Sequence, residues 1–307
     1  MNSNEIANCT TTQELCCLEN LKEPHQTVVS ALNVLLSIVA SMGNVLIFLA
    51  LQKVSSLHPP SKLLLGCLAT TDLCVGLISQ PLFVTLILAP EHSKLCYYSS
   101  TLSNTLGFIF CGVSFLTTTA ISVDRLLALM LGLRYRQVVT LRRVWVLVFL
   151  FWLVTTVISI TVLYERRMAE VILAIIMPPC LATSIFCYTK IYLTLHRHQA
   201  QVKANRLQGQ PNESRIPLNI ARFRRTVSSA MWIQMTLLAC YLPLGIVTGL
   251  RGVLGLHSPT FHQAHGVAIS LLMLNSTLNP FLYCWKIRDV RRAARDTIKK
   301  WNCSSAG

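Results

Sequence analysis

The sequence predicts an all-α membrane protein: a seven-transmembrane helix bundle with a short amphipathic helix after the seventh span. Hydrophobic residues make up 53% of the 307 residues and charged residues only 13%, whereas soluble domains carry roughly 25% charged residues. The apolar residues are gathered into runs of about 20 or more, which is long enough to cross a bilayer as helices. The seven runs cover residues 27–51, 61–88, 98–130, 142–163, 169–195, 223–250 and 264–286.

The distribution of basic residues predicts the orientation of the bundle. Of the 27 Lys and Arg residues, 22 lie in the loops and helix ends on the side of the C-terminal tail. The exceptions are Lys22, Lys94, Arg166, Arg167 and Arg251. This positive-inside pattern places the N-terminus outside and the C-terminus in the cytoplasm. We therefore expect a multi-pass protein of the plasma membrane, whose net charge of +15 serves topology and contacts with membrane lipids and does not bind nucleic acid.

The predicted organisation is an extracellular tail (1–26), the bundle (27–286), and a cytoplasmic amphipathic helix and tail (287–307). No apolar core precedes a small-residue cleavage site, so we expect no signal peptide. Asn8-Cys9-Thr10 is an acceptor triplet for N-glycosylation that an outside tail would expose.

The second span carries Asp72, the one acidic residue deep within a predicted span. A carboxylate at the bilayer centre costs at least roughly 2.5–3.5 kcal/mol, so Asp72 should face the interior of the bundle. Its expected partners are Asn44, Asn275 and Asn279. We predict a polar or sodium-binding cluster, with a protonated, hydrogen-bonded structural Asp72 as the alternative. Pro81 should then kink this helix.

The seventh span is interrupted by Asn279 and Pro280. Pro280 has no N–H group, which leaves the carbonyl one turn earlier without its usual partner. In lipid, a freed carbonyl needs a substitute donor from a neighbouring helix, a polar side chain or water. We therefore expect this helix to face inward, with a hinge near its cytoplasmic end.

Polar segments follow three other spans. The third ends with Asp124 and Arg125, and the fifth leads into a polar loop predicted over 196–222. After the seventh, Lys286 to Lys300 is predicted to form an amphipathic helix on the membrane surface. Its apolar positions are Ile287, Val290, Ala294 and Ile298. Cys303 is a candidate for palmitoylation, with a free thiol as the alternative.

These residues resemble the sequence marks of rhodopsin-like (class A) G-protein-coupled receptors over about residues 27–300. The matching positions are Asn44, Asp72, Asp124, Arg125, Trp152, Pro179, Tyr188, Cys240, Pro243 and Asn279 to Tyr283. The resemblance implies a receptor, not an enzyme, that binds an extracellular small-molecule or peptide ligand and activates a heterotrimeric G protein. The short second outer loop without Cys resembles melanocortin receptors, and Lys286 to Arg291 is similar to the same segment of adenosine receptors.

The resemblance also implies roles in activation. Arg125 would contact the G protein, and Tyr188 and Tyr283 would swing inward to support it. Asp72 would bind an allosteric sodium ion in the resting state, and no other cofactor is implied. The full set implied for coupling and activation is Asp124, Arg125, Tyr188, Tyr241, Pro243, Asn279, Pro280 and Tyr283.

The sequence departs from the family pattern at several positions. Leu126 replaces the Tyr that usually follows Arg125, Gly132 replaces a Pro, and Tyr241 replaces the Trp before the proline of the sixth span. The start of the sixth span has no acidic residue that could restrain Arg125, which permits signalling without ligand.

The family's usual disulfide has no counterpart, because the second outer loop lacks Cys and Ser100 stands at the usual position in the third span. The cysteines expected outside are Cys9, Cys16, Cys17 and Cys96. An even number in an oxidising space favours pairing. Cys96 with Cys16 or Cys17 would tie the tail over the mouth of the bundle.

A ligand pocket is expected between the outer halves of spans three, five, six and seven. The candidate lining residues are Asn104, Cys111, Tyr241 and His265, with core packing as the alternative role. Gly107 stands where amine receptors have an Asp, which disfavours a biogenic amine. The alternative function is a small ion-coupled transporter or channel with Asp72 as the ion site. It predicts an internal repeat, and we find no convincing one.

Overall fold

The computed structural model describes residues 23–55, 57–90, 93–164, 166–207, 235–250, 259–286 and 288–304. All regular secondary structure within these ranges is helical. The elements are α2 (Glu23–Lys53), α3 (Pro59–Cys74), η2 (Val75–Ser79), α4 (Gln80–Leu88), α5 (Lys94–Leu131), η3 (Gly132–Arg134), α6 (Tyr135–Val138), α7 (Leu141–Tyr164), α8 (Arg166–Leu207), the helix Met235–Leu250, α10 (Pro259–Lys286) and α11 (Arg288–Ser304).

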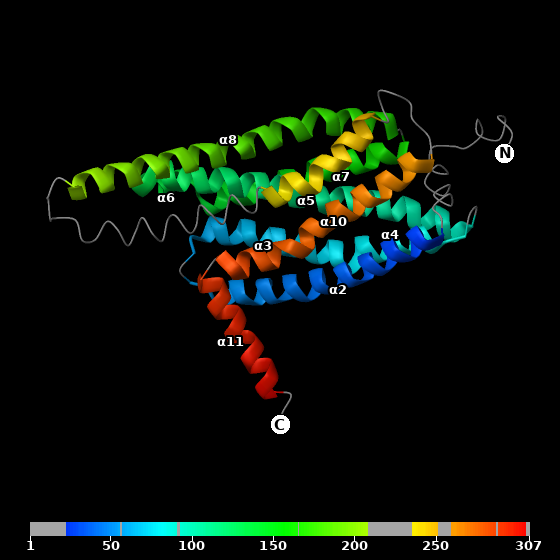
Figure 1. Cartoon of the computed structure of the whole chain (residues 1–307), viewed down its shortest axis with the longest axis horizontal. Helices are drawn as coiled ribbons and strands as arrows, with labels where there is room; N and C mark the ends of the chain where they lie inside the picture. The colour runs from blue at the N-terminus through cyan, green and yellow to red at the C-terminus, as the bar shows by residue number, and fades with distance from the viewer. Residues whose placement is uncertain are drawn as a thin grey trace.

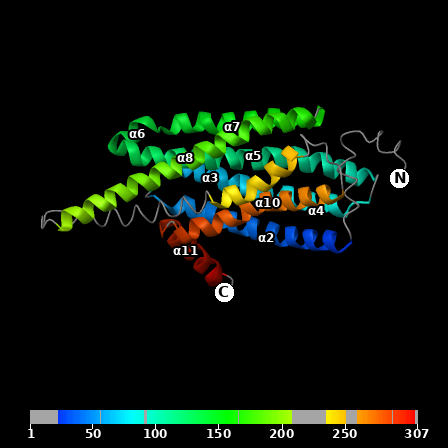
Figure 2. The same ribbon diagram turned by 45° about the horizontal axis from the view of Figure 1, so that its top comes forward.

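The long helices lie side by side in one bundle (Figure 1). In Figure 1 and in the turned view of Figure 2, α2 lies along one side, α7 and α8 along the opposite side, and α3 and α5 between them. Four described segments are long and apolar enough to cross a membrane: His25–Lys53, Pro59–Leu88, Lys94–Val138 and Leu141–Thr161. These four, with α8, the apolar helix Met235–Leu250 and α10, follow the order of the seven predicted spans. The predicted all-α bundle is confirmed.

Apolar side chains cover the outside of the bundle, and polar ones lie inside it. Met42 of α2 and Phe149 of α7 are 68% and 66% exposed, whereas Asn44, Asp72 and Asn279 are almost fully buried. In water such an apolar surface would promote association, but in a bilayer it contacts lipid tails. The distribution is that of a multi-pass membrane protein.

The regular α-helix of the second span is interrupted near Pro81, and the interruption begins before the proline; the kink itself stays a prediction. Residues Val75–Ser79 form the π-helical turn η2, in which the N–H group of Gln80 bonds to the carbonyl of Val75. The next bond in this register would join residue 81 to the carbonyl of Gly76, but Pro81 has no N–H group. The hydroxyl of Ser37 in α2 donates to that carbonyl instead, at 2.7 Å.

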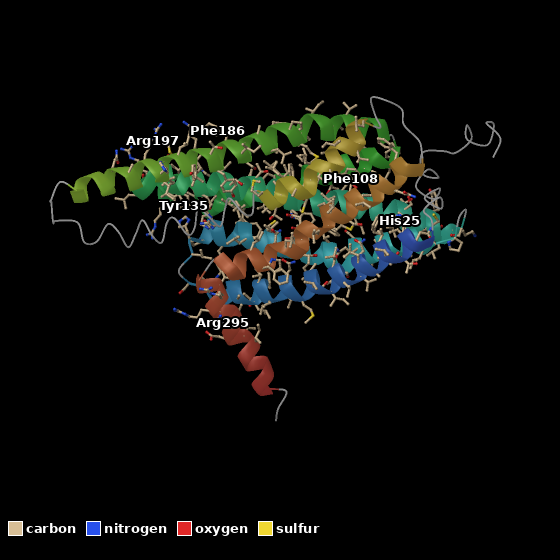
Figure 3. The ribbon with its side chains drawn as sticks, viewed as in Figure 1. His25, Phe108, Tyr135, Phe186, Arg197 and Arg295 are labelled. Atoms are coloured by element: carbon tan, nitrogen blue, oxygen red, sulfur yellow. The ribbon has the colours of Figure 1, made fainter. Side chains whose placement is uncertain are left out.

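The helix that contains the fifth span is longer than predicted. Helix α8 continues to Leu207, so the prediction of a loop from residue 196 is wrong for residues 196–207. The reason is that this stretch contains neither Gly nor Pro, which first occur at Gly209 and Pro211. With 42 residues, α8 measures about 63 Å, about twice the thickness of the hydrocarbon core. Its C-terminal part, with Arg197, therefore extends beyond the bundle (Figure 3).

The helix after the seventh span is confirmed as α11, which turns away from the bundle axis (Figure 1). Its buried face consists of Val290, Ala294 and Thr297. Ile298, predicted on that face, is 42% exposed. The Nζ of Lys53 donates to the Thr297 hydroxyl at 2.7 Å, which joins the end of α2 to α11.

Candidate functional site

Asp72 lies at the centre of a buried polar cluster contributed by α2, α3, α5 and α10. The Ser114 and Ser276 hydroxyls donate to its Oδ1 at 2.9 and 2.8 Å. The Nδ2 of Asn279 donates to its Oδ2 at 2.6 Å. We call these residues, with Asn44, the Asp72 cluster. A carboxylate with three donors is the compensated form of a buried acid.

Asn44 enters the cluster through the main chain of α10 and not through Asp72. Its Nδ2 donates to the carbonyl oxygens of Ala40 and Ser276 at 2.9 and 3.0 Å. Ser276 is four residues before Pro280, so its carbonyl is the one that the proline leaves without a partner. A Cβ on Gly43 would lie 2.8 Å from the Pro280 Cγ, so only glycine allows this contact.

The donor set of the Asp72 cluster fits a small hard cation. It offers a carboxylate and two hydroxyl oxygens, the ligand types that such cations prefer. The Nδ2 of Asn275 is buried without a protein partner, and buried amides usually bond to protein, water or ion. Among the described residues no group of three or more His, Cys, Asp or Glu could hold a metal ion, so a thiolate or imidazole site for a transition metal does not fit.

Tyr241 lies deep in the bundle and connects α5 to the helix Met235–Leu250. Its hydroxyl donates to the main-chain carbonyl of Cys111 at 3.1 Å, and its ring centroid lies 4.8 Å from that of Phe115. Ser114 of the Asp72 cluster lies beside the same hydroxyl. Tyr241 and Cys111 are both buried and act as packing partners. Their contact with a ligand stays a prediction.

A second buried polar group surrounds Asp124 at the end of α5. Ser61 of α3 donates to its Oδ2 at 2.8 Å, and Tyr135 of α6 donates to its Oδ1 at 2.6 Å. The two hydroxyls lie 3.1 Å apart. The Tyr135 ring also packs against His58, with centroids 5.1 Å apart.

Gly132 makes the contact between Tyr135 and Asp124 possible. It caps α5 with a φ of 50° and a ψ of −115°, after which η3 and α6 lead the chain back toward α5. A proline, the usual residue of the family here, has φ fixed near −65° and could not adopt this turn. The departure at Gly132 therefore changes how the loop is built.

Arg125 lies beside this group but does not join it. Both carboxylate oxygens of Asp124 accept from neutral hydroxyls, and within the described residues Arg125 forms no hydrogen bond or ion pair. One turn before it, Ser122 donates to the Tyr188 hydroxyl at 3.1 Å. Leu126, which stands where the family has Tyr, packs against the apolar cluster around Tyr188.

The remaining predicted positions are brought together less closely. Asn104, Pro243 and His265 are half-buried, and the side chain of Tyr283 lies outside the described residues. Cys96 is disulfide-bonded, and six other described cysteines are free, so its partner also lies outside the described residues. Asn8, Cys16 and Cys17 lie outside the described residues, as does the side chain of Cys303, so the calls on these four stay predictions.

The partners of Asp124 are not evident from the sequence. Ser61 and Tyr135 lie 63 and 11 residues from Asp124 in the sequence. Neither belongs to a sequence pattern that predicts a polar contact between helices. The signal that could have found Tyr135 is Gly132, because a glycine between a long helix and a basic loop favours a tight reversal.

Comparison with known proteins identifies the family to which this fold belongs. The chain matches the family "7 transmembrane receptor (rhodopsin family)" over residues 43–172 and 167–283. It is 26% identical to the adenosine receptor A3 of Ovis aries over 273 residues, 83% of this chain and 84% of the relative. It is 23% identical to melanocortin receptor 5 of Rattus norvegicus over 277 residues, 86% and 82% of the two chains. The matched region includes Asn44, Asp72, Asp124, Arg125 and Pro280, and the chain belongs to the rhodopsin family of seven-transmembrane receptors.

Proposed function

We propose that this receptor lies in the plasma membrane with its N-terminus outside, binds an extracellular ligand and activates a heterotrimeric G protein. The observation that supports coupling best is the state of Arg125. Its neighbour Asp124 accepts from Ser61 and Tyr135, and no acidic side chain of the described residues pairs with the guanidinium, which would therefore contact a partner. Because the chain belongs to a receptor family, we prefer the receptor function to the alternative of a transporter or channel.

The surface around Arg125 suits a protein partner. Leu133, at the tip of the loop after α5, is 98% exposed, and Arg134 and Arg136 beside it are also exposed. An exposed apolar side chain with a basic rim is typical of a docking site for an acidic protein surface. Arg125 and Leu133 would contact the G protein, and inward movement of Tyr188 and Tyr283 would support Arg125.

The ligand would enter from the opposite end of the bundle, where the outer halves of α5, α8, Met235–Leu250 and α10 meet. Asn104, Cys111, Tyr241 and His265 are the lining residues we propose. The names of the relatives refer to two ligands, adenosine and melanocortin, so the proposal includes both a small molecule and a peptide.

We also propose that the resting state holds a sodium ion at the Asp72 cluster. Asp72, Ser114 and Ser276 would supply oxygen ligands, and Asn275 would complete the polar surroundings. The ion would neutralise the buried carboxylate. The residues around it, Asn44 and Asn279, keep α2, α3 and α10 in register.

The decisive experiment is Arg125→Ala, measured as nucleotide exchange on each G-protein class in membranes with and without the receptor. We expect normal surface expression and loss of most ligand-independent exchange. Arg292→Ala, which removes an exposed arginine of α11, is the matched control and should signal like wild type. If Arg125→Ala reaches the surface and signals fully with every class, the proposed coupling is wrong.

The orientation has its own test in the tail. Glycosidase treatment should shift the wild-type protein on a gel, and Asn8→Gln should abolish the shift. A shift that is lost only on changing Asn212 or Asn302 would reverse the proposed topology.

A further inference from the structure

A cleft opens at the beginning of α7, away from both polar clusters. It has a volume of about 420 Å³ and is lined by Thr140, Arg142, Arg143 and Val146. Ligand pockets typically measure roughly 300–1,000 Å³, so the cleft is large enough for a charged headgroup. It lies at the end of the bundle that carries Asp124, which we proposed above to be cytoplasmic.

The cleft carries positive charge, and no acidic side chain of the described residues forms an ion pair with it. Arg142 and Arg143 are both exposed, and the sequence has no acidic residue between Asp124 and Glu165. The Nη1 of Arg143 donates to the Val138 carbonyl at 2.6 Å, which fixes its guanidinium at the end of α6. An arginine has five N–H donors, so four remain for an anion.

The apolar part of the cleft belongs to the lipid-facing surface of α7. Val146 lines the cleft and is 53% exposed, and Trp145 beside it is 56% exposed. Trp is enriched where the hydrocarbon core meets the headgroups. Further into the membrane, Phe149 continues the same exposed apolar surface. The cleft therefore joins two neighbouring arginines to a surface that contacts acyl chains.

We propose that this cleft binds the phosphorylated headgroup of an anionic phospholipid from the cytoplasmic leaflet. Arginine forks bond phosphate oxygens in pairs, and the Thr140 hydroxyl adds a neutral donor. The acyl chain would lie along Val146 and Phe149. Two adjacent arginines match a headgroup with more than one negative charge, such as a phosphoinositide, better than a singly charged one. A soluble phosphate compound would use the arginines but not the apolar wall.

The test uses the full chain in phosphatidylcholine nanodiscs that contain a photoactivatable phosphatidylinositol bisphosphate. After illumination, mass spectrometry should locate the label in the segment 140–150. Arg142→Gln/Arg143→Gln should reduce labelling by roughly thirtyfold, since each basic residue near the surface raises the affinity by a factor of about five and the two factors multiply. Arg134→Gln/Arg136→Gln removes the same charge from exposed positions outside the cleft and should label nearly like wild type.

A second variant separates binding from topology, because arginines in this loop also help to orient the protein. Arg142→Lys/Arg143→Lys keeps the charge but lacks the fork, so it should insert normally and label less than wild type. If Arg134→Gln/Arg136→Gln lost as much labelling as Arg142→Gln/Arg143→Gln, the lipid would be attracted by positive charge in general, and the proposal would be overturned. Competition by soluble inositol trisphosphate as strong as that by the unlabelled lipid would identify a soluble phosphate ligand and would also overturn it.

Discussion

Asn44 of α2 donates a hydrogen bond of 3.0 Å to the main-chain carbonyl of Ser276 in α10. Pro280 leaves that carbonyl without an intrahelical partner, and water is scarce at this depth. The asparagine supplies the missing donor, and Gly43 beside it lets the two helices approach closely enough. Pro280 is thus accommodated within α10 without leaving this carbonyl unpaired.

A similar arrangement occurs in the second span, near Pro81 of α4. Pro81 leaves the Gly76 carbonyl without its donor in the π-helical register, and Ser37 of α2 supplies one at 2.7 Å. In both cases the substitute comes from α2, seven residues apart and on the same face of that helix. Helix α2 therefore holds the two proline-distorted helices in place.

This role of α2 predicts a specific loss of stability in Asn44→Ala. The variant leaves the Ser276 carbonyl buried and unpaired, which should cost about 1–3 kcal/mol. Thermal unfolding of the purified receptor in detergent should show a lower midpoint. Thr85→Ala is the control, because the half-buried Thr85 bonds only to the Pro81 carbonyl of its own helix. Equal midpoints for the two variants would contradict the role of Asn44.

Gly43→Ala tests the close approach of α2 and α10. The added Cβ would lie 2.8 and 2.9 Å from two side-chain atoms of Pro280, so the helices must move apart and the unfolding midpoint should fall. Gly66→Ala is the matched control, since nothing lies within 4 Å of its added Cβ. Alanine favours a helix over glycine by about 1 kcal/mol, so Gly66→Ala should be neutral or stabilising. A stabilised Gly43→Ala would argue against tight packing there.

Asp72→Asn tests the proposed sodium site. An ion that binds only the resting state must favour that state. Replacing potassium chloride with sodium chloride should therefore lower the ligand-independent nucleotide exchange by the wild-type receptor. The same exchange of salts should raise its unfolding midpoint, because the ion stabilises the folded form it binds. Asp72→Asn should respond equally to both salts. A wild type that does not distinguish the two ions would leave Asp72 with a structural role alone.

The sequence predicted the polar surroundings of Asp72 better than it predicted those of Asp124. A charged residue or a proline within an apolar run has few ways to be satisfied, so Asp72 and Pro280 each implied polar neighbours in other spans. Asp124 lies at a helix end, where water is an equally good partner. Its contact with Tyr135 depends on the φ of Gly132, a backbone angle that residue types alone do not determine.

The length of α8 shows a second limit of the sequence. The stretch 196–207 is polar, and polarity favoured a loop, yet polar residues without Gly or Pro continue a helix readily in water. Apolar runs mark where a helix lies in the membrane and not where it ends.

Tyr241→Phe tests whether the hydroxyl at this position holds the resting state. The variant keeps the ring against Phe115 and loses the hydroxyl, with its bond to the Cys111 carbonyl and its contact with Ser114. If that bond exists only in the resting state, its loss of about 1 kcal/mol should raise ligand-independent exchange roughly fivefold. Tyr192→Phe, at an exposed position of α8, should leave the rate unchanged. A lower rate in Tyr241→Phe would mean that the bond supports the active state.

The last prediction concerns the two hydroxyls that occupy Asp124. Tyr135→Phe keeps the ring beside His58 but removes the donor to Oδ1, which lies 2.6 Å away in wild type. A buried carboxylate that loses a donor attracts the nearest cation, and Arg125 is the adjacent residue. We expect Arg125 to be drawn to Asp124, so that nucleotide exchange falls while surface expression is kept.

Two further variants decide whether this is the cause. Gly132→Pro cannot adopt the φ of 50° that brings Tyr135 to Asp124, so it should reduce exchange in the same way. Both changes act on one contact. The double variant Tyr135→Phe/Gly132→Pro should therefore show no less nucleotide exchange than the single variant with the lower exchange. Asp124→Asn in the Tyr135→Phe background removes the charge that attracts Arg125 and should restore exchange. If it does not, capture of Arg125 by Asp124 is not what limits coupling.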